Sequence, residues 1–541
     1  MGYTPWYKHA VFYELYLKGF YDSNGDGIGD VRGLIEKLDY LQELGIDCIW
    51  LPPIYPSPER DDGYDVADYY TIAPKYGTMQ DFQELLKEVH KRDMKLIIDL
   101  VLNHTSDQHP WFQEAKKGPT SPYFHYYVWS KTPEKYKEAR IIFLDTETSN
   151  WAYCEENGYY YWHRFYSHQP DLNYDNPEVR REMKKVLLYW LDMGVDGFRV
   201  DAVPYLFERE GTNCENLPET HEYLKELRAM VEKHYPEAIL LAEANQWPQD
   251  LLPYFGNGDE FHMAFNFPLM PRLFMALKTR DVSPIVKIME GLPEIPVQCQ
   301  WCNFLRNHDE LTLEMVTPEE REYMWKMYAP EKRMRLNLGI RRRLAPLLDN
   351  DQRKIRLLHS VLFTLPGTPI LYYGDEIGMG DNIALPDRNG VRTPMQWNTS
   401  RNAGFSVAPP ERLYAPVIEK GDFSYQKVNV EIASHDPSSL FSWIKGWIAL
   451  RKRNPVFGMG KIEFFSGKDP ALLWYRVYDG KEEVLVFAFF GDMEKEIVLD
   501  MRQWQGKTLI DIEGKKPTFS LNKETVVWKF SPYEYKVFLV K

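Results

Sequence analysis

An arginine and an aspartate two residues apart end a largely apolar stretch near the middle of the chain. Residues 193–201 read as a short buried strand that carries Arg199 and Asp201 at its carboxyl end. Because residues two apart on a strand point to the same face, the guanidinium can hydrogen-bond the carboxylate and lower its pKa, as a nucleophile requires. The alternative is a structural ion pair inside a barrel. Further acids at the same edge would favour the catalytic interpretation.

Two more acids follow stretches that read as strands. Glu243 ends the stretch 238–243, and Asp309 follows the stretch 301–306. The carboxyl ends of the parallel strands of a barrel meet at its catalytic face. A retaining glycosidase needs two carboxyls about 5–5.5 Å apart: one attacks the anomeric carbon, and the other, kept protonated, protonates the leaving oxygen. Asp201 and Glu243 lie on neighbouring predicted strands and fit this pair, whereas chemistry alone does not assign Asp309.

Two histidines, His104 and His308, each follow an asparagine at the end of a predicted strand. A single histidine is more often a hydrogen-bonded core residue than a ligand. At the functional edge of a barrel the same side chain can hold sugar hydroxyls. We favour this interpretation for both histidines.

Helix and strand patterns alternate at short spacing along most of the chain, as in βα units. The strands are apolar throughout, which is typical of parallel strands buried on both faces. Eight of them predict an α/β protein with a (β/α)8 TIM barrel, built from residues 1–104 and 171–455. Residues 105–170 break the alternation after strand 3 and predict an irregular inserted domain, since a loop of that length is improbable. Residues 310–353 read as a helical excursion near the active site, and residues 460–541 as a C-terminal antiparallel β-sandwich.

The composition bears on partners and compartment. The 541 residues carry a net charge of −14, so we expect neither nucleic acid nor membrane as a partner. Aromatic residues make up 15% of the chain, which suits stacking on the apolar faces of sugars. Five cysteines indicate no disulfide framework and favour the cytoplasm, and the pair Cys299 and Cys302 reads as packing. A homo-oligomer is left open.

Oxygen-bearing side chains recur at alternate positions between residues 22 and 30, with Gly27 at the sharp turn. This is the front of a calcium loop of the EF-hand type, but position twelve is Gly33 instead of glutamate. We therefore predict a single cation site without EF-hand helices; the alternative is a turn without metal. The predicted ligands are the four side chains and one carbonyl of this loop: Asp22, Asn24, Asp26, Ile28 and Asp30.

Four blocks in a fixed order make the chain similar to the α-amylase superfamily of glycoside hydrolases: residues 99–104, 197–202, 241–245 and 304–309. The resemblance covers essentially the whole chain. It implies that Asp201 is the nucleophile, Glu243 the general acid/base and Asp309 the residue that grips sugar hydroxyls and stabilises the transition state.

Motifs at residues 22–30, 169–173 and 387–397 resemble the branch of this family that acts on oligosaccharides. In that branch Asp61 and Arg392 would cap the non-reducing glucose, which implies a blind pocket for short substrates. The substrate-binding residues implied by the resemblance are Asp61, Tyr64, His104, Gln169, Arg199, Tyr205, His308, Glu310, Glu314 and Arg392.

Residues 201–221, 307–314 and 339–350 look like the members of the branch that interconvert maltose and trehalose. We therefore expect intramolecular transglycosylation between these disaccharides, through a covalent glucosyl-enzyme and with minor hydrolysis to glucose. Because water competes with the trapped glucose, the site must close, and Tyr205, Glu310 and Glu314 are the candidate lid. For the two glutamates the alternative is an exposed acidic helix start. The alternative function is an α-glucosidase or oligo-1,6-glucosidase that hydrolyses short α-glucosides with the same catalytic residues.

The resemblance also implies a structural calcium site that ties the barrel to the insert. Oxygen-only ligands suit calcium, and magnesium is left open at one of the two cation sites. For Glu208 the alternative is a surface charge. The implied ligands are Asn103, Asp171, Glu208 and the carbonyls of Tyr205 and Leu206.

Overall fold

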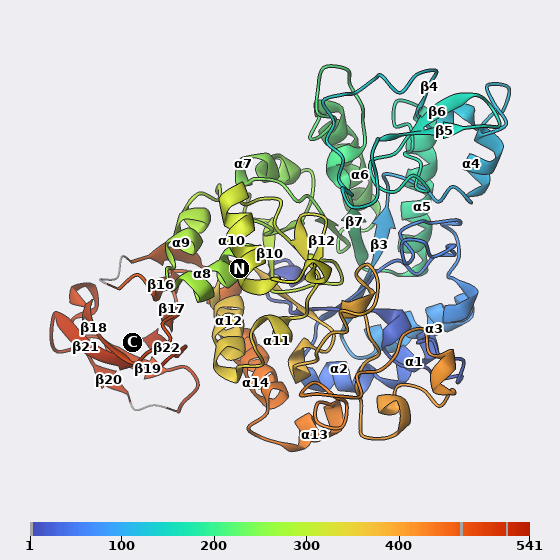
Figure 1. Cartoon of the computed structure of the whole chain (residues 1–541). Coiled ribbons are helices and arrows are strands. Elements are labelled where there is room, and N and C mark those ends of the chain that lie inside the picture. Colours follow the sequence, from blue (N-terminus) through green and yellow to red (C-terminus); the bar gives the residue numbers. More distant parts are fainter. Residues whose placement is uncertain (1–3, 466–468, 516–517) are drawn as a thin grey trace.

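The chain folds around a closed barrel of eight parallel strands, which confirms the predicted fold class (Figure 1). The computed structural model describes residues 4–465, 469–515 and 518–541. Residues 1–3 of the predicted barrel, and 466–468 and 516–517 of the predicted C-terminal domain, lie outside them. The strands follow in the order β1-β14-β10-β9-β8-β7-β3-β2. Their bounds are β1 (Phe12–Glu14), β2 (Cys48–Leu51), β3 (Lys95–Val101), β7 (Gly197–Asp201), β8 (Ile239–Ala242), β9 (Met263–Phe265), β10 (Gln300–Phe304) and β14 (Thr368–Tyr372).

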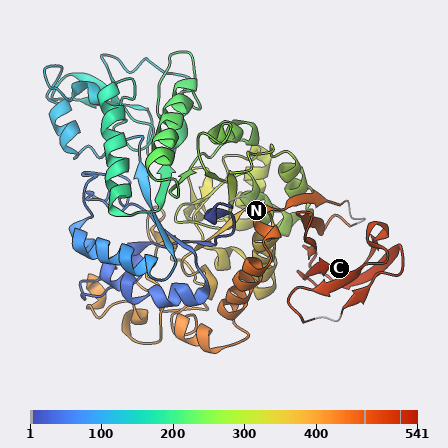
Figure 2. The ribbon, with the colours of Figure 1, turned by 180° about the vertical axis from the view of Figure 1, so that it is seen from behind.

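Helices surround the barrel and bury their apolar faces against it (Figures 1 and 2). None of the helices in the described part of the chain is long and apolar enough to span a bilayer. The longer helices are α1 (Val31–Glu36), α2 (Leu38–Leu44), α3 (Met79–His90), α5 (Pro177–Met193), α6 (Pro218–His234), α8 (Leu269–Thr279), α9 (Ser283–Glu290), α12 (Gln352–Thr364) and α14 (Leu440–Arg453).

The unit α5–β7 shows how local sequence places the catalytic strand. The side chain of Asn176 caps the first turn of α5, and Gly194 ends the helix with a φ of 110°. Gly197 then begins β7 with a φ of 144°, and a Cβ there would lie 2.2 Å from the carbonyl oxygen of Ile239. Only glycine lets β7 approach β8 this closely. The register places Asp201 next to Glu243, whose backbone N–H donates to the Val200 carbonyl at 3.0 Å.

The insert at residues 105–170 is more regular than predicted. It contains α4 (Pro110–Ala115) and a three-stranded antiparallel sheet in the order β4-β6-β5. Trp151 and Trp162 are buried in its own small core. The tyrosine-rich segments that looked irregular pair as strands because one face of each packs on this core. The strand bounds are β4 (Trp129–Ser130), β5 (Trp151–Cys154) and β6 (Tyr159–Trp162).

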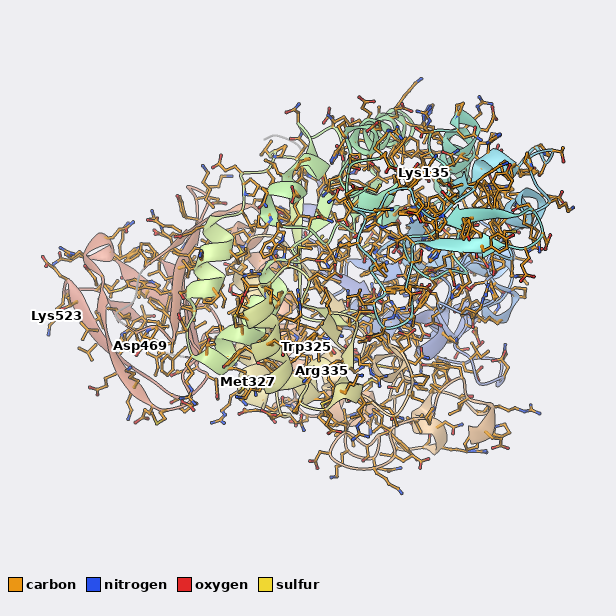
Figure 3. The ribbon with its side chains drawn as sticks, turned by 45° about the horizontal axis from the view of Figure 1, so that its top comes forward. Lys135, Trp325, Met327, Arg335, Asp469 and Lys523 are labelled. Carbon is orange, nitrogen blue, oxygen red and sulfur yellow. The ribbon has the colours of Figure 1, made fainter. Side chains whose placement is uncertain are left out.

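The excursion at residues 310–353 is only partly helical, so the predicted helical excursion was wrong in part. It holds α10 (Pro318–Tyr328) and the short α11 (Leu344–Leu347), but also a three-stranded sheet in the order β11-β13-β12. The guanidinium of Arg335 lies over the ring of Trp325, which joins the sheet to α10 (Figure 3). Two-residue strands carry too few residues for a period-2 pattern, so the sequence does not reveal them. Their bounds are β11 (Leu311–Thr312), β12 (Arg335–Leu336) and β13 (Gly339–Ile340).

The C-terminal region forms the predicted antiparallel domain at the end of the molecule away from the insert (Figure 1). A six-stranded sheet in the order β15-β16-β17-β22-β19-β20 packs on the two-stranded sheet β18-β21 around its own apolar cluster. The other face of the larger sheet meets α14, where the Trp443 indole donates to the Tyr535 hydroxyl at 2.8 Å. The strand bounds are β15 (Lys461–Phe464), β16 (Leu472–Tyr478), β17 (Glu483–Phe489), β18 (Lys495–Asp500), β19 (Thr508–Asp511), β20 (Phe519–Ser520), β21 (Thr525–Phe530) and β22 (Tyr535–Val540).

Candidate active site

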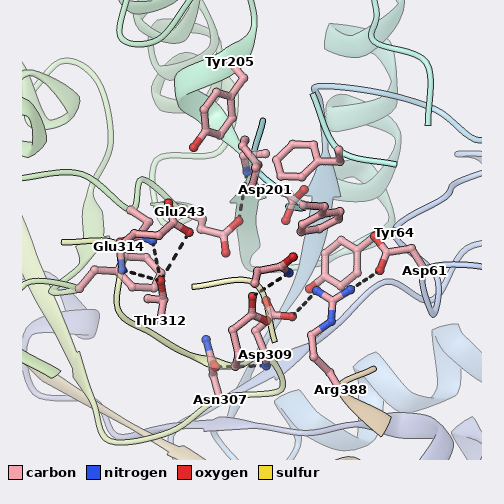
Figure 4. A pocket seen from close by; sticks show the side chains of 18 of the residues that line it. Asp61, Tyr64, Asp201, Tyr205, Glu243, Asn307, Asp309, Thr312, Glu314 and Arg388 are labelled. Carbon is pink, nitrogen blue, oxygen red and sulfur yellow. Dashed lines mark hydrogen bonds and ion pairs between the residues drawn. The ribbon is translucent and has the colours of Figure 1, made fainter. Parts of the chain in front are cut away.

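A pocket at the carboxyl ends of the barrel strands gathers the three predicted catalytic acids (Figure 4). It offers about 120 Å³ to water-sized molecules, and side chains of the barrel, the insert and the excursion line it. We call the group at the barrel strand ends the floor, and the group where the insert and the excursion meet the mouth. The floor is Arg199, Asp201, Glu243, His308 and Asp309, and the mouth is Arg140, Tyr205, Glu310, Glu314 and Asn337.

Arg199 lies at the centre of the floor and is 1% exposed. Its Nη1 lies 2.5 Å from Oδ1 of Asp201 and 2.5 Å from Oδ1 of Asp99, which is its partner on β3. Its Nη2 lies 2.5 Å from Oε1 of Glu243. One guanidinium therefore orients both members of the predicted catalytic pair. The backbone N–H of Ala202 adds a bond to Oε2 of Glu243 at 3.2 Å, and Ala202 adopts a φ of 51°, the kind of strain found at functional sites.

The environments of the two acids separate their pKa values. Burial raises the pKa of Asp201 to about 6, although Arg199 opposes the rise. Burial raises the pKa of Glu243 to about 8; Arg199 again opposes this, while Asp201 and Asp309 add to it. We expected Arg199 to give Asp201 a low pKa; its attraction is present, but burial outweighs it. Between these values Asp201 is ionised and Glu243 is protonated, as a nucleophile and a general acid require.

Asp309 lies among three cations. Its Oδ1 accepts from Arg388 at 2.8 Å and from Arg392 at 3.2 Å, and its Oδ2 lies 3.2 Å from Nε2 of His308. Burial alone would raise the pKa of Asp309, but these neighbours hold it well below its usual range. Asp309 is therefore a permanent anion that can accept hydrogen bonds from sugar hydroxyls.

Arg388 is the arginine that lines the pocket beside Asp61. Nη2 of Arg388 lies 2.6 Å from Oδ1 of Asp61, and its guanidinium lies 5.5 Å from the ring centre of Phe143. Both Asp61 and Arg388 line the pocket (Figure 4). Arg392, which we expected to cap the glucose with Asp61, instead pairs with Asp62 at 3.0 Å behind the pocket wall and is not among the lining residues. Two arginines four residues apart share one motif, and only the turn between them decides which faces the cavity.

Gln169, Tyr64 and His104 hold the wall beside Asp61. The Gln169 amide donates to Asp61 at 2.7 Å, but Gln169 itself lies behind the wall. Tyr64 stacks on the ring of His308, with its hydroxyl 2.8 Å from Nε2. His104 lines the pocket, and burial lowers its pKa to about 3, so the ring is neutral. Its Nε2 lies 3.2 Å from the Tyr64 carbonyl.

The mouth joins the insert to the excursion through one arginine that the sequence did not reveal. Nη1 of Arg140, on the insert, lies 2.6 Å from Oε2 of Glu314 on the excursion. Its Nε lies 2.8 Å from Glu215, and its Nη2 lies 3.2 Å from the hydroxyl of Tyr205. Glu215 also pairs with the buried Arg164 at 2.9 Å. No motif marks Arg140, because its role depends on a contact between segments more than 170 residues apart.

A second contact closes the mouth beside Glu310. The backbone N–H of Asn337 donates to Asp145 of the insert at 2.8 Å, and the Asn337 amide donates to Glu310 at 3.4 Å. The Oε2 atom of Glu310 is buried without a partner, and Glu310 lines the pocket. Burial raises its pKa to about 7, with Arg388 opposing the rise. Of the three candidate lid residues, Tyr205 and the two glutamates all line the pocket, as expected for groups that face a sugar.

The predicted calcium site between barrel and insert contains partnerless buried oxygens. Oδ1 of Asn103, Oδ2 of Asp171 and Oε1 of Glu208 are all buried without a hydrogen bond. Burial raises the pKa of Asp171 to about 8, and burial together with Asp171 raises that of Glu208 well above its usual value. A cation bound there would offset the free-energy cost of burying the ionised forms of both carboxyls. The site has only two carboxylates, and no group of three or more acidic, histidine or cysteine side chains placed to hold a metal ion occurs in the described ranges.

In the loop at residues 22–30, by contrast, the acidic side chains accept hydrogen bonds from backbone N–H groups. Asp22 accepts from the backbone N–H groups of Gly25 and Gly27, each at 2.8 Å, and Asp26 accepts from that of Ile28 at 2.9 Å. Asp30 caps α1. These bonds stabilise the turn with or without a metal, so the cation site predicted at this loop stays a prediction.

The chain matches known proteins over most of its length. The family described as "Alpha amylase, catalytic domain" matches residues 14–460. The "trehalose synthase/amylase" of Mycolicibacterium smegmatis is 54% identical over 524 residues, covering 94% of this chain and 88% of that protein. The trehalose synthase of Pimelobacter sp. is 53% identical over 531 residues, covering 96% and 93%. The solved trehalulose synthase of Pseudomonas mesoacidophila superposes with a TM-score of 0.80 at 28% identity and covers 100% of both chains. A barrel with these acids at its strand ends and a family match of this extent establish one conclusion: the chain belongs to the α-amylase family.

Proposed function

We propose that this protein interconverts maltose and trehalose by intramolecular transglycosylation. The observation that carries the proposal is the pair Asp201 and Glu243, held by one guanidinium, under a mouth where the insert and the excursion meet. Relatives named trehalose synthase, more than 50% identical over almost the whole chain, support it.

The first half of the reaction takes place on the floor. With the non-reducing glucose against Asp61 and Arg388, Asp201 attacks C1 from one face while Glu243 donates its proton to the bridging oxygen. The C1–O bond to the second glucose breaks and a C1–Asp201 ester forms. The pKa order of the two acids, about 6 for Asp201 and about 8 for Glu243, suits these roles at neutral pH.

The second half depends on the mouth. The released glucose turns so that its anomeric hydroxyl faces the ester. Glu243 accepts the proton of that hydroxyl, the oxygen attacks C1, and Asp201 leaves, so that two inversions keep the α configuration. Glu310, with a partnerless buried oxygen, and Tyr205 are placed to hold the turning glucose. Because water at the same position yields glucose, closure of the mouth decides the product.

We also propose a structural calcium ion at Asn103, Asp171 and Glu208, with the carbonyls of Tyr205 and Leu206. The oxygen-only ligand set and the three partnerless oxygens support it. The ion would fix the end of the insert to the turn after β7 and hold Tyr205 at the mouth. It takes no part in the chemical steps.

One isotope experiment tests the function and separates it from its rival. The enzyme is given unlabelled maltose together with free ¹³C-glucose. The sugars are separated by chromatography, and the ¹³C content of each is measured by mass spectrometry. If the released glucose stays in the pocket, trehalose should be the main product and should carry little ¹³C. Mostly glucose would identify the hydrolase of short α-glucosides instead, and heavily labelled trehalose would mean that glucose leaves before the second attack. Glu310→Ala should raise the glucose formed per trehalose; an unchanged ratio would remove Glu310 from the mouth.

A further inference from the structure

A buried carboxylate lies directly behind the floor and has no role in the steps above. Glu14 ends β1 and is 0% exposed. Its Oε1 accepts from both the backbone N–H of His308, at 3.3 Å, and the ring Nδ1 of His308. Its Oε2 is buried without a hydrogen bond. Among the ion pairs of the described residues, His308 is the partner of Glu14. A carboxylate that is desolvated to this degree needs a cation, and His308 is the group placed to supply it.

The His308 ring is held by two aromatic rings and at both nitrogens. Tyr64 stacks on one face at 5.4 Å between ring centres, and Trp50 meets it edge-on at 5.9 Å. On the far side from Glu14, Nε2 lies 2.8 Å from the Tyr64 hydroxyl and 3.2 Å from Oδ2 of Asp309. The ring therefore lies between two carboxylates, a geometry in which both nitrogens carry a proton.

Titratable groups face the His308 ring from each neighbouring element. Glu14 contributes from β1, Asp309 from the same loop, Asp99 from β3 and Tyr64 from the loop after β2. Arg392 binds the His308 carbonyl at 2.9 Å. Burial favours a neutral ring, but Asp309 and Glu14 outweigh it and raise the pKa of His308 to about 10. Asp375 and Tyr372 are the further titratable groups near Glu14.

We propose that Glu14 is a positioning residue of the reaction: it keeps His308 doubly protonated, and the Nε2–H side of that ring then holds Tyr64 and Asp309 in the orientation that grips the reacting glucose. Glu14 itself touches no substrate. The inference rests on the proposed double displacement at Asp201. Without the Glu14 carboxylate at Nδ1, the His308 ring loses a proton in the working pH range. It then no longer holds the Asp309 carboxylate in place beside the sugar.

The test is a double-mutant cycle of Glu14→Gln and His308→Gln, measured as fluoride release from α-glucosyl fluoride. With this substrate kcat/KM reports only the first displacement, which an isomerase and a hydrolase share, so that ratio is independent of which disaccharide forms. Glu14→Gln should lower kcat/KM by roughly 10- to 100-fold, as for loss of a preorganised charge at a reacting centre. In the His308→Gln background, Glu14→Gln should cost no further activity and should raise Tm, because it removes an unpaired buried carboxylate.

Three outcomes of the cycle and its control would overturn the proposal. One is a wild-type kcat/KM in Glu14→Gln. Another is a loss that multiplies with that of His308→Gln, because Glu14 would then act independently of the ring. The third is an equal loss in Glu376→Gln, a matched buried carboxyl that accepts from Tyr13 and Tyr40 away from the pocket. The pH dependence of fluoride release is a further test, because a simple loss of packing would not change it. Fluoride needs no proton from Glu243, so Glu14→Gln alone should acquire an alkaline limb near neutral pH, and its absence would also count against the proposal.

Discussion

The floor and the mouth of the pocket are built by different physical means. On the floor, Arg199 and His308 are 1% exposed, and each lies between carboxylates on adjoining strand ends. At the mouth, the side chain of Arg140 is 35% exposed and that of Glu314 is 19% exposed, and the two belong to loops distant in the sequence. Buried pairs are costly to break and exposed pairs are worth little. The floor is therefore held firmly, whereas the ion pair between Arg140 and Glu314 contributes little to holding the mouth together.

The largest effect should come from removing the nucleophile on the floor. Asp201→Asn keeps the hydrogen bond to Arg199 but cannot form the ester, so turnover of α-glucosyl fluoride should fall by about 10⁴-fold or more. Thermal melting should show that the variant stays folded. Substantial residual turnover in pure protein would show that another group attacks C1, and the assignment of the floor would be wrong.

The pH dependence should also follow the floor. As pH falls through about 6, Asp201 gains a proton and loses nucleophilicity, and as pH rises through about 8, Glu243 loses the proton that it must donate. The rate on maltose should therefore be bell-shaped and fall about tenfold per unit outside these limits. Glu243→Gln, assayed with α-glucosyl fluoride, should lack the alkaline limb. A limb that persists in this variant would have to belong to another group.

The floor was largely predictable from the sequence, because its residues follow apolar strands at short spacing. Helix and strand periodicity gives the barrel, and the acids at residues 201, 243 and 309 are adjacent to those strands. In the structure Arg388 lines the pocket beside Asp61, whereas Arg392 pairs with Asp62, because a turn within one motif decides which side chain faces the cavity. The mouth was predictable only in part. Tyr205 and Glu310 lie near the motifs, but Arg140 acquires its role only when the insert folds back over the barrel.

The mouth should control the product without controlling the first chemical step. Arg140→Gln removes the ion pair with Glu314 and also the pairing with Glu215 and the contact with Tyr205, while Glu215 keeps Arg164 as a partner. A half-exposed pair such as that of Arg140 with Glu314 is worth up to about 1 kcal/mol. The ratio of glucose to trehalose formed from maltose should therefore rise by up to about fivefold. Turnover of α-glucosyl fluoride should change far less, because the floor is intact.

A matched exposed pair provides the control for this substitution. Arg60 pairs with Asp107 at the base of the insert, outside the pocket lining. Arg60→Gln should leave the product ratio unchanged. If both substitutions raise hydrolysis alike, loosening of the insert as a whole is responsible, and the specific contact between Arg140 and Glu314 is not.

The smallest effect should come from the proposed calcium ion that joins the floor to the mouth. Chelation should lower Tm by about 2–5 °C, and calcium should restore it in the wild type but not in Asp171→Asn. The sign of the pH dependence follows from the raised pKa of Asp171. In the cation-free protein the fold tolerates this buried carboxyl only when it is protonated, so the free energy of unfolding should fall as pH rises from the usual aspartate pKa of 3.8 through about 8. Calcium should abolish that fall, because the bound ion favours the ionised carboxylates. Equal melting curves with and without calcium across this range would mean that Asn103, Asp171 and Glu208 hold no ion, and that Tyr205 is positioned by packing alone.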